Sequence, residues 1–135
     1  MAADAKQIVQ QLFGEVVNKG NLDRVDELLA PEFVTHTPQG DLKGVAGFRS
    51  YVEAWRTAFP DVRCEVIDVI QEDDRVAWRV RATGTHKRES FGVPATGHSV
   101  DFEAMHHGHT RDGQLVEHWV MMDLGAVFDQ LRRAP

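Results

Sequence analysis

Four of the seven histidines in this 135-residue sequence lie within residues 103–120, which read EAMHHGHTRDGQLVEHWV. They are His106, His107, His109 and His118. Imidazole is a common ligand of transition metals, and its pKa of about 6.5 also suits it to proton transfer near neutral pH. The cluster therefore suggests a metal site, an acid–base site or a histidine-rich surface.

Strand parity divides this cluster. Residues 98–110 alternate in hydropathy, as a half-buried strand does. The apolar face of that strand carries His106 together with Val100, Phe102 and Ala104. His107 and His109 point to the opposite face, so this strand cannot readily supply three histidines to one metal ion. We therefore expect no metal, and we place His107 and His109 in solvent or at a subunit contact.

A second strand is expected at residues 115–122. One of its faces carries His118 together with Val116, Val120 and Met122. The sequence Asp112-Gly113 is typical of a tight hairpin turn. Such a hairpin would bring His106 and His118 to the same concave face. Spacing alone leaves His106 open to two interpretations, a core histidine bonded to a backbone carbonyl or a proton shuttle.

The remaining elements must position these side chains. Apolar residues recur at helical spacing over residues 4–18, 22–29 and 44–59, and a short C-terminal helix is expected at 123–133. Period-two strands are expected at 64–70, 75–86, 98–110 and 115–122, and an extended segment at 30–40 carries His36. Helices followed by an antiparallel meander predict an α+β fold. We expect one domain over residues 1–135, a cone-shaped curved antiparallel sheet wrapped around the N-terminal helices, with a ligand pocket inside.

Composition narrows the classes of partner. The net charge is −6 and no basic stretch is present, which argues against nucleic acid or an anionic membrane as a partner. Cys64 is the only cysteine, so no intrachain disulfide can form. The sequence shows no signal peptide and no membrane-spanning run, so a cytoplasmic location is expected.

Several motifs occur in an order typical of one family. They are FPD at 59–61, GTH at 84–86, FGVPATG at 91–97 and DGQLVEHW at 112–119. With these motifs, nearly the whole chain resembles the SnoaL-like polyketide cyclase, or ester cyclase, family. That family belongs to the nuclear-transport-factor-like and ketosteroid-isomerase-like superfamily. The resemblance implies the α+β cone and frequent oligomerisation through the sheet.

The resemblance also implies site residues. Well-understood members of the family close a ring by intramolecular aldol condensation, with an aspartate on the last strand and a nearby histidine on the preceding strand. His106 matches that histidine, whereas Val120 stands at the position of the aspartate. Similarity to the isomerases places His36 at the position of their base and Phe13 at that of a tyrosine.

Two hypotheses about function follow. In the first, the protein is a cofactor-free cyclase or isomerase that binds a small hydrophobic carbonyl compound. Its acid–base residues would be His106, His36 and His118. The expected substrate-binding residues are Phe13, Val17, Trp55, Phe59, Phe102, Val120 and Met122. In the second, the protein binds a small molecule without catalysis, an alternative that Val120 favours.

Self-association is expected as well. The strand face opposite His106 carries apolar side chains that are too extensive to remain in water. They include Met105, Trp119 and Met121, next to His107. A homodimer or a larger homo-oligomer is therefore expected.

Overall fold

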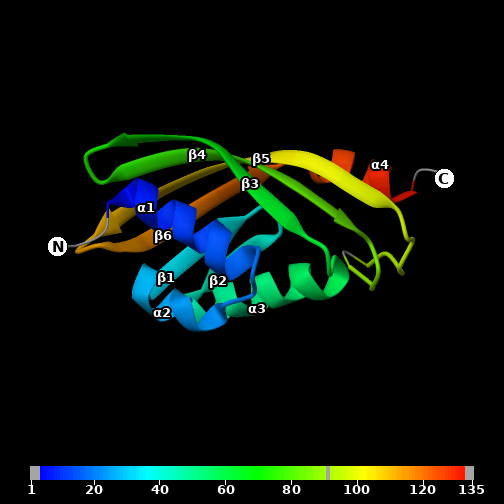
Figure 1. Cartoon of the computed structure of the whole chain (residues 1–135), viewed down its shortest axis with the longest axis horizontal. Helices are drawn as coiled ribbons and strands as arrows, with labels where there is room; N and C mark the ends of the chain where they lie inside the picture. The colour runs from blue at the N-terminus through cyan, green and yellow to red at the C-terminus, as the bar shows by residue number, and fades with distance from the viewer. Residues whose placement is uncertain (1–3, 91, 133–135) are drawn as a thin grey trace.

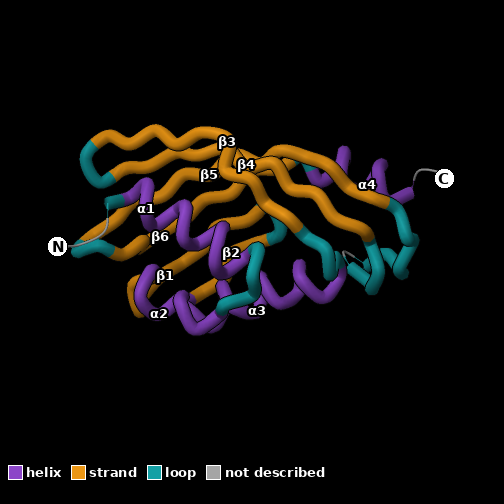
Figure 2. Tube along the Cα trace, in the orientation of Figure 1, coloured by secondary structure: helices purple, strands orange, loops and turns teal. Residues whose placement is uncertain are grey.

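The computed structural model describes residues 4–90 and 92–132 and has the expected α+β fold (Figure 1). Its helical segments are α1 (Ala5–Gln11), η1 (Leu12–Val17), η2 (Leu22–Arg24), α2 (Val25–Leu28), α3 (Gly44–Ala58) and α4 (Leu124–Arg132). Its strands are β1 (Leu29–Thr37), β2 (Gly40–Lys43), β3 (Arg63–Glu72), β4 (Arg75–Thr85), β5 (Ser99–Arg111) and β6 (Gln114–Met122). The strands form one curved sheet in the order β2-β1-β6-β5-β4-β3. The helices α1, α2 and α3 lie on its concave side (Figure 2).

The sheet is mixed, which corrects the prediction of a wholly antiparallel one. β1 runs parallel to β6, and β1 pairs with β2 as a short hairpin. The hydropathy pattern of residues 30–40 predicts only an extended segment here. Parallel neighbours need a long connection between them. Here that connection includes most of the chain, so no local sequence pattern predicts that β1 and β6 are neighbours.

The first helix changes pitch where it meets the pocket. Asp4 caps α1 by accepting a hydrogen bond from the backbone N–H of Gln7, as its sequence position predicts. The helix then continues as a π-helix over η1, in which the N–H of Asn18 donates to the carbonyl of Phe13 at 3.0 Å. Phe13 and Val17, four residues apart on η1, both line the interior cavity.

The β5–β6 hairpin contains a bulge that sequence periodicity missed. Its turn residues Asp112 and Gly113 both have positive φ angles, 53° and 78°, as expected for this tight turn. The register then shifts, because Thr110 pairs with Leu115 whereas His109 pairs with Glu117. Leu115 is consequently fully buried, whereas uninterrupted alternation along the strand would place it on the outer face with Trp119 and Met121.

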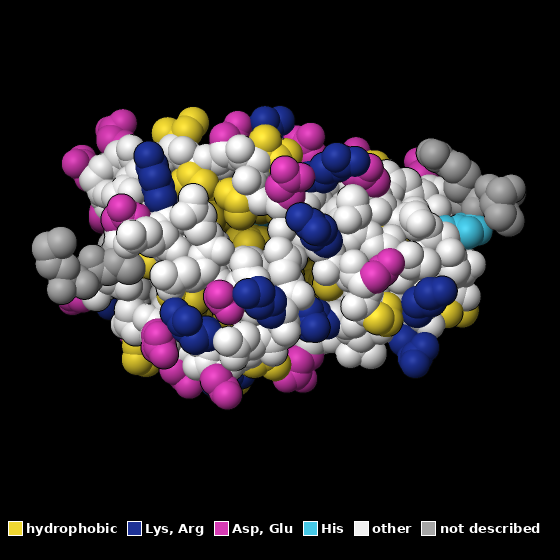
Figure 3. All heavy atoms as spheres, viewed as in Figure 1, with side chains coloured by type: hydrophobic (Ala, Val, Ile, Leu, Met, Phe, Trp, Pro, Cys, Tyr) yellow, Lys and Arg dark blue, Asp and Glu magenta, His cyan; other side chains and the backbone are white. Residues whose placement is uncertain are grey.

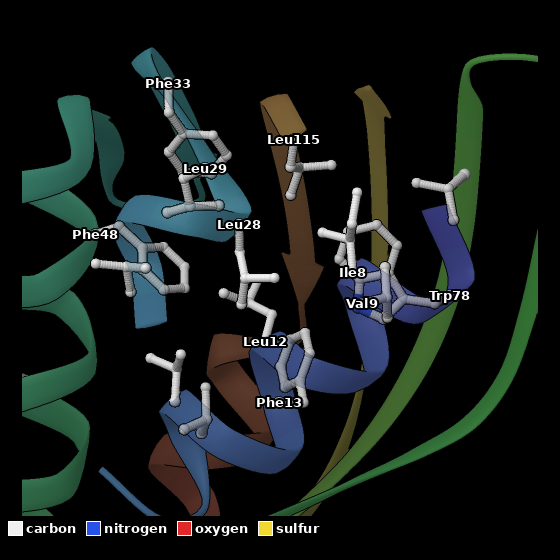
Figure 4. Close-up of a cluster of buried hydrophobic side chains, with 14 of the residues drawn as sticks. Ile8, Val9, Leu12, Phe13, Leu28, Leu29, Phe33, Phe48, Trp78 and Leu115 are labelled. Carbon is white, nitrogen blue, oxygen red and sulfur yellow. The ribbon is translucent and has the colours of Figure 1, made fainter. Parts of the chain in front are cut away.

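The core lies between the sheet and the helices. In Figure 4, Phe33 of β1, Phe48 of α3 and Leu115 of β6 point into the same interior as Leu12 and Phe13. A second cluster, which includes Phe59, Val100, Val127 and Leu131, joins α3, β5 and α4. On the face in Figure 3, basic and acidic side chains are interspersed. None of the described helices is long and apolar enough to cross a membrane.

Gly108 allows the close approach of the Glu117 backbone and the Leu115 side chain on the neighbouring strand. A Cβ at this position would lie 2.8 Å from the Glu117 carbonyl oxygen and 2.9 Å from Cδ1 of Leu115, both closer than a normal contact. We expect Gly108→Ala to lower the free energy of unfolding by about 1–3 kcal/mol, because the two paired strands must separate. Urea unfolding measures this change.

Gly14→Ala is the matched control for that substitution. A Cβ at Gly14 meets no atom within 4 Å, and alanine is the better helix former. This variant should therefore be as stable as the original protein or slightly more stable. Equal stability of the two alanine variants would contradict the packing assigned to Gly108.

Candidate functional site

An apolar cavity lies between the sheet and the helices. It encloses about 630 Å³, including its open mouth. Its walls are formed by Phe13, Val17, Phe48, Tyr51, Val52, Trp55, Val62, Cys64, Val80, Ala82, Phe102, Ala104, His106, His118, Val120 and Met122. No Lys, Arg, Asp or Glu occurs among these described residues. The space can therefore accept an uncharged, mostly apolar molecule.

Two histidines form a hydrogen-bonded pair in the wall of this cavity. Nδ1 of His106 lies 2.7 Å from Nε2 of His118. The two rings come from neighbouring strands, in which His106 pairs with Val120 and Gly108 pairs with His118. None of the described residues hydrogen-bonds to Nε2 of His106, so this atom is available to a bound molecule.

Aromatic side chains fix the orientation of both imidazoles. The indole of Trp78 stacks on His106 at a centroid distance of 5.1 Å and on His118 at 5.2 Å. Phe13 contacts His106 edge-on at 5.2 Å. Trp78 lies opposite His106 on the neighbouring strand β4 and is almost fully buried, so its indole restricts the movement of both rings.

Burial keeps this pair uncharged. His106 is 8% exposed and His118 is 3% exposed. Desolvation lowers the pKa of His106 well below its ordinary value, and the neighbouring His118 lowers it further. Burial likewise lowers the pKa of His118 to about 3, with a smaller contribution from the charge on His36. Both rings are therefore neutral at pH 7.

Val120 lies directly beside the pair. It is the cross-strand partner of His106 and lines the same cavity. At this position, for which the family resemblance implies an aspartate, the wall offers only methyl groups. His118, two residues earlier on the same strand face, is the polar group that contacts His106 instead.

Other polar atoms of the cavity wall are neutral. Burial raises the pKa of the Cys64 thiol to about 12, so this cysteine stays protonated near neutral pH. Burial also raises the pKa of Tyr51. Tyr51 was not among the expected substrate-binding residues, although it precedes Trp55 by about one turn of α3 and lines the same cavity.

His36 does not reach the cavity, which corrects its expected role as a pocket base. On β1, Thr35 faces inward beside His118, and His36 faces outward beside Trp119. His36 stacks on Trp119 at 5.1 Å. The alternation of Phe33 and Thr35 with His36 would have shown this orientation had the segment been recognised as a strand.

His36 is held between two carboxylates on the outer face. Its Nδ1 lies 2.7 Å from Oδ1 of Asp41, and its Nε2 lies 2.6 Å from Oε2 of Glu117. A carboxylate only accepts hydrogen bonds, so both ring nitrogens carry protons and the ring is a cation. The hydrogen bond to Glu117, followed by that to Asp41, raises the pKa of His36. The bond to His36 lowers the pKa of Glu117.

This arrangement predicts a pH-dependent contribution to stability. Folding raises the pKa of His36, so the protonated ring stabilises the fold. This contribution is complete below the ordinary pKa of 6.5 and is lost as the pH rises through the pKa of the folded protein. The lowered pKa of Glu117 stabilises the fold above its ordinary value of 4.5 and is lost on acidification. The stability lost in His36→Gln should therefore be largest near pH 5–6, roughly 1 kcal/mol, and should decline at higher pH.

Urea unfolding of the two proteins from pH 5 to pH 9 measures this difference. His107→Gln is the control, because the His107 ring packs against Trp119 on the same face without bonding these carboxylates. A His36→Gln deficit that does not change with pH would contradict the charged state assigned to His36.

The other outward histidines lie where parity predicted. His107 is exposed, and Nε2 of His109 lies 3.3 Å from Oε1 of Glu117. Within residues 4–90 and 92–132, no group of three or more His, Cys, Asp or Glu side chains is arranged to hold a metal ion.

Phe59 was expected to bind substrate, but it does not line the cavity. It is fully buried in the second core cluster, where it stacks on His86 and packs beneath Gly84. It follows the last residue of α3, where the chain turns away from the cavity wall. The other expected substrate-binding residues, from Phe13 to Met122, are on that wall.

Known proteins share this architecture. A candidate SnoaL-like polyketide cyclase from Jannaschia sp. CCS1 is 26% identical to this chain, and the two structures superpose with a TM-score of 0.87. That match covers 96% of this chain and 92% of the Jannaschia chain. IdmH, a candidate polyketide cyclase from Streptomyces antibioticus, is 33% identical with a TM-score of 0.84, covering 96% and 99%. A candidate polyketide cyclase from Acidithiobacillus ferrooxidans is 30% identical with a TM-score of 0.85, covering 100% and 99%.

Sequence comparison agrees with these structural matches. No curated protein matches the chain significantly. The sequence model of the SnoaL-like polyketide cyclase family, however, matches residues 7–131, which include every strand and the histidine pair. The chain therefore belongs to the SnoaL-like polyketide cyclase family.

Proposed function

We propose that this protein is a cofactor-free enzyme that transfers a proton on a small, uncharged, hydrophobic carbonyl compound. The observation that carries the proposal is the neutral His106–His118 pair in an otherwise apolar cavity. Nε2 of His106 is the proposed proton-transferring atom. The absence of charged side chains among the described wall residues favours an ester or ketone over a free acid.

The proposed step forms an enolate. Nε2 of His106 takes a proton from the carbon next to the carbonyl. The electron pair of the broken C–H bond forms the carbon–carbon double bond of the enolate, and the π pair of the carbonyl moves to its oxygen. The positive charge gained by His106 is shared with His118 through their 2.7 Å hydrogen bond. The enolate then attacks a second carbonyl, as in ring closure, or regains the proton elsewhere, as in isomerisation.

A deuterium-exchange experiment tests this function. Uncharged polyketide-like esters and enones that raise the unfolding temperature are incubated with the protein in deuterated water. Mass spectrometry then detects exchange of the proton next to the carbonyl. Protein-dependent exchange supports the enzyme. Binding without exchange or product for every ligand supports instead a non-catalytic binding protein, for which Val120 is the specific observation.

The convex face of the sheet is proposed to bind a second copy of the chain. Met105 and Met121 are 54% and 68% exposed and face each other across β5 and β6. The next cross-strand pair on the same face of the sheet is His107 and Trp119. Exposed apolar side chains that cluster in the middle of a sheet are typical of a homodimer interface.

Met121→Glu is expected to weaken self-association at least about tenfold, because two copies would bury two unpaired carboxylates. Sedimentation equilibrium at micromolar concentration measures the dissociation constant. Glu103→Gln, an exposed residue on the same face, serves as the control. A single-chain mass for the original protein would contradict the proposal.

A further inference from the structure

A buried hydroxyl adjoins the histidine pair on the side away from Nε2 of His106. Thr35 is fully buried, and its Oγ1 lies 3.4 Å from Nδ1 of His118. β1 and β6 pair in parallel with Thr35 opposite His118, so the backbone register fixes this contact. Three groups thus form a chain from Thr35 through His118 to His106.

Neutral imidazoles in such a chain must adopt matching tautomers. Each ring carries one proton, and the bond between Nδ1 of His106 and Nε2 of His118 needs one donor and one acceptor. Either both rings carry the proton on Nε2, or both carry it on Nδ1. In the first state His106 presents an N–H to the cavity, and in the second it presents a lone pair.

Only the second state can remove a proton from a bound molecule. In that state Nδ1–H of His118 points toward Thr35, and Oγ1 accepts its hydrogen bond. After proton transfer the extra charge is shared by the two rings, and Nδ1–H of His118 still requires an acceptor. Among the described residues, Oγ1 of Thr35 is the partner of that nitrogen.

We infer that Thr35 is a positioning residue that makes the Nδ1–H tautomer of His118 and His106 accessible and so allows a lone pair on Nε2 of His106. The Thr35 hydroxyl can donate to Nδ1 of His118 or accept from it, and among the described residues it is the group that accepts from Nδ1–H. The inference rests on the proposed function, in which that lone pair accepts the substrate proton. Thr35 is absent from the cavity wall and acts only through His118. A buried N–H without an acceptor is unfavourable, so loss of the hydroxyl shifts both rings to the Nε2–H tautomer.

Other titratable groups near the pair do not replace this contact. Tyr51 and Cys64 line the cavity, where burial raises the pKa of each and keeps it protonated. The cationic His36 lies on the opposite face of β1, where Asp41 and Glu117 bind both of its ring nitrogens. Its charge disfavours a proton on His118.

The test replaces Thr35 by valine, which has nearly the same shape, and by serine, which restores the hydroxyl. Thr83→Val makes the same chemical change on the outer face of β4. Ring ¹⁵N NMR of the ligand-free proteins at pH 7 reports the tautomers. We expect the Nδ1–H form of both rings to be populated in the original protein, Thr35→Ser and Thr83→Val, and to give way to the Nε2–H form in Thr35→Val. Identical tautomers in the original protein and Thr35→Val would overturn the inference.

Kinetics provide the second readout. Thr35→Val should lower kcat about tenfold, the effect of losing one weak buried hydrogen bond, with little change in KM. Thr35→Ser should recover most of this loss. An unchanged kcat, or a loss confined to KM, would also overturn the inference. If no ligand undergoes proton exchange, the proposed function fails, whereas the NMR comparison still decides whether Thr35 sets the tautomer.

Discussion

Replacing His106 by glutamine is expected to reduce turnover by about 10²–10⁴-fold, the usual contribution of a general acid–base group. The same change at the adjacent His107 should leave turnover near its original value. Both positions carry a histidine on β5, but the two side chains point to opposite faces of the sheet. Nε2 of His106 is open to the cavity, whereas the His107 ring packs on Trp119 outside it.

Glutamine is chosen so that the loss can be attributed to chemistry. Its amide can still hydrogen-bond His118, so the buried ring of His118 keeps a partner. Turnover and ligand affinity are measured on both variants, and urea unfolding establishes that each is folded under assay conditions. Retained turnover in a folded, ligand-binding His106→Gln variant would remove His106 from the mechanism and favour a binding protein.

Introducing an acidic residue at position 120 is expected to change both the stability of the fold and the charge state of the His106–His118 pair. Val120→Asp places a carboxylate in an apolar wall beside His106, which should cost about 2–4 kcal/mol of unfolding free energy near pH 7. The carboxylate should also raise the pKa of His106, which burial now lowers, because an adjacent negative charge favours the imidazolium.

Two consequences of that raised pKa can be measured. Ring ¹⁵N NMR should show His106 gaining its second proton at higher pH than in the original protein. As the pH is lowered, the activity of the variant should begin to fall at a higher pH than that of the original protein. The reason is that only the neutral imidazole accepts a proton. Val120→Asn controls for polarity and size without charge and should produce neither shift. Equal His106 titration in the aspartate and asparagine variants would contradict the close approach of positions 106 and 120.

The sequence determined which residues lie on the same strand face and therefore much of the fold. Alternation along β5 placed His106 inward with Val100 and Ala104, and His107 outward, because successive side chains of a strand point to opposite sides. Helical spacing similarly identified α3, whose Trp55 lines the cavity. These properties depend only on near neighbours in the chain, so the sequence was sufficient to predict them.

Tertiary structure decided which faces meet. The parallel pairing of β1 with β6 joins segments about 80 residues apart, and this pairing turns Thr35 toward His118 and His36 toward Glu117. The bulge in β6 buries Leu115 without any local change in composition. The tautomer of His106 depends in turn on groups from three strands. A hydrogen bond between such distant residues depends on backbone register, which local hydropathy does not encode.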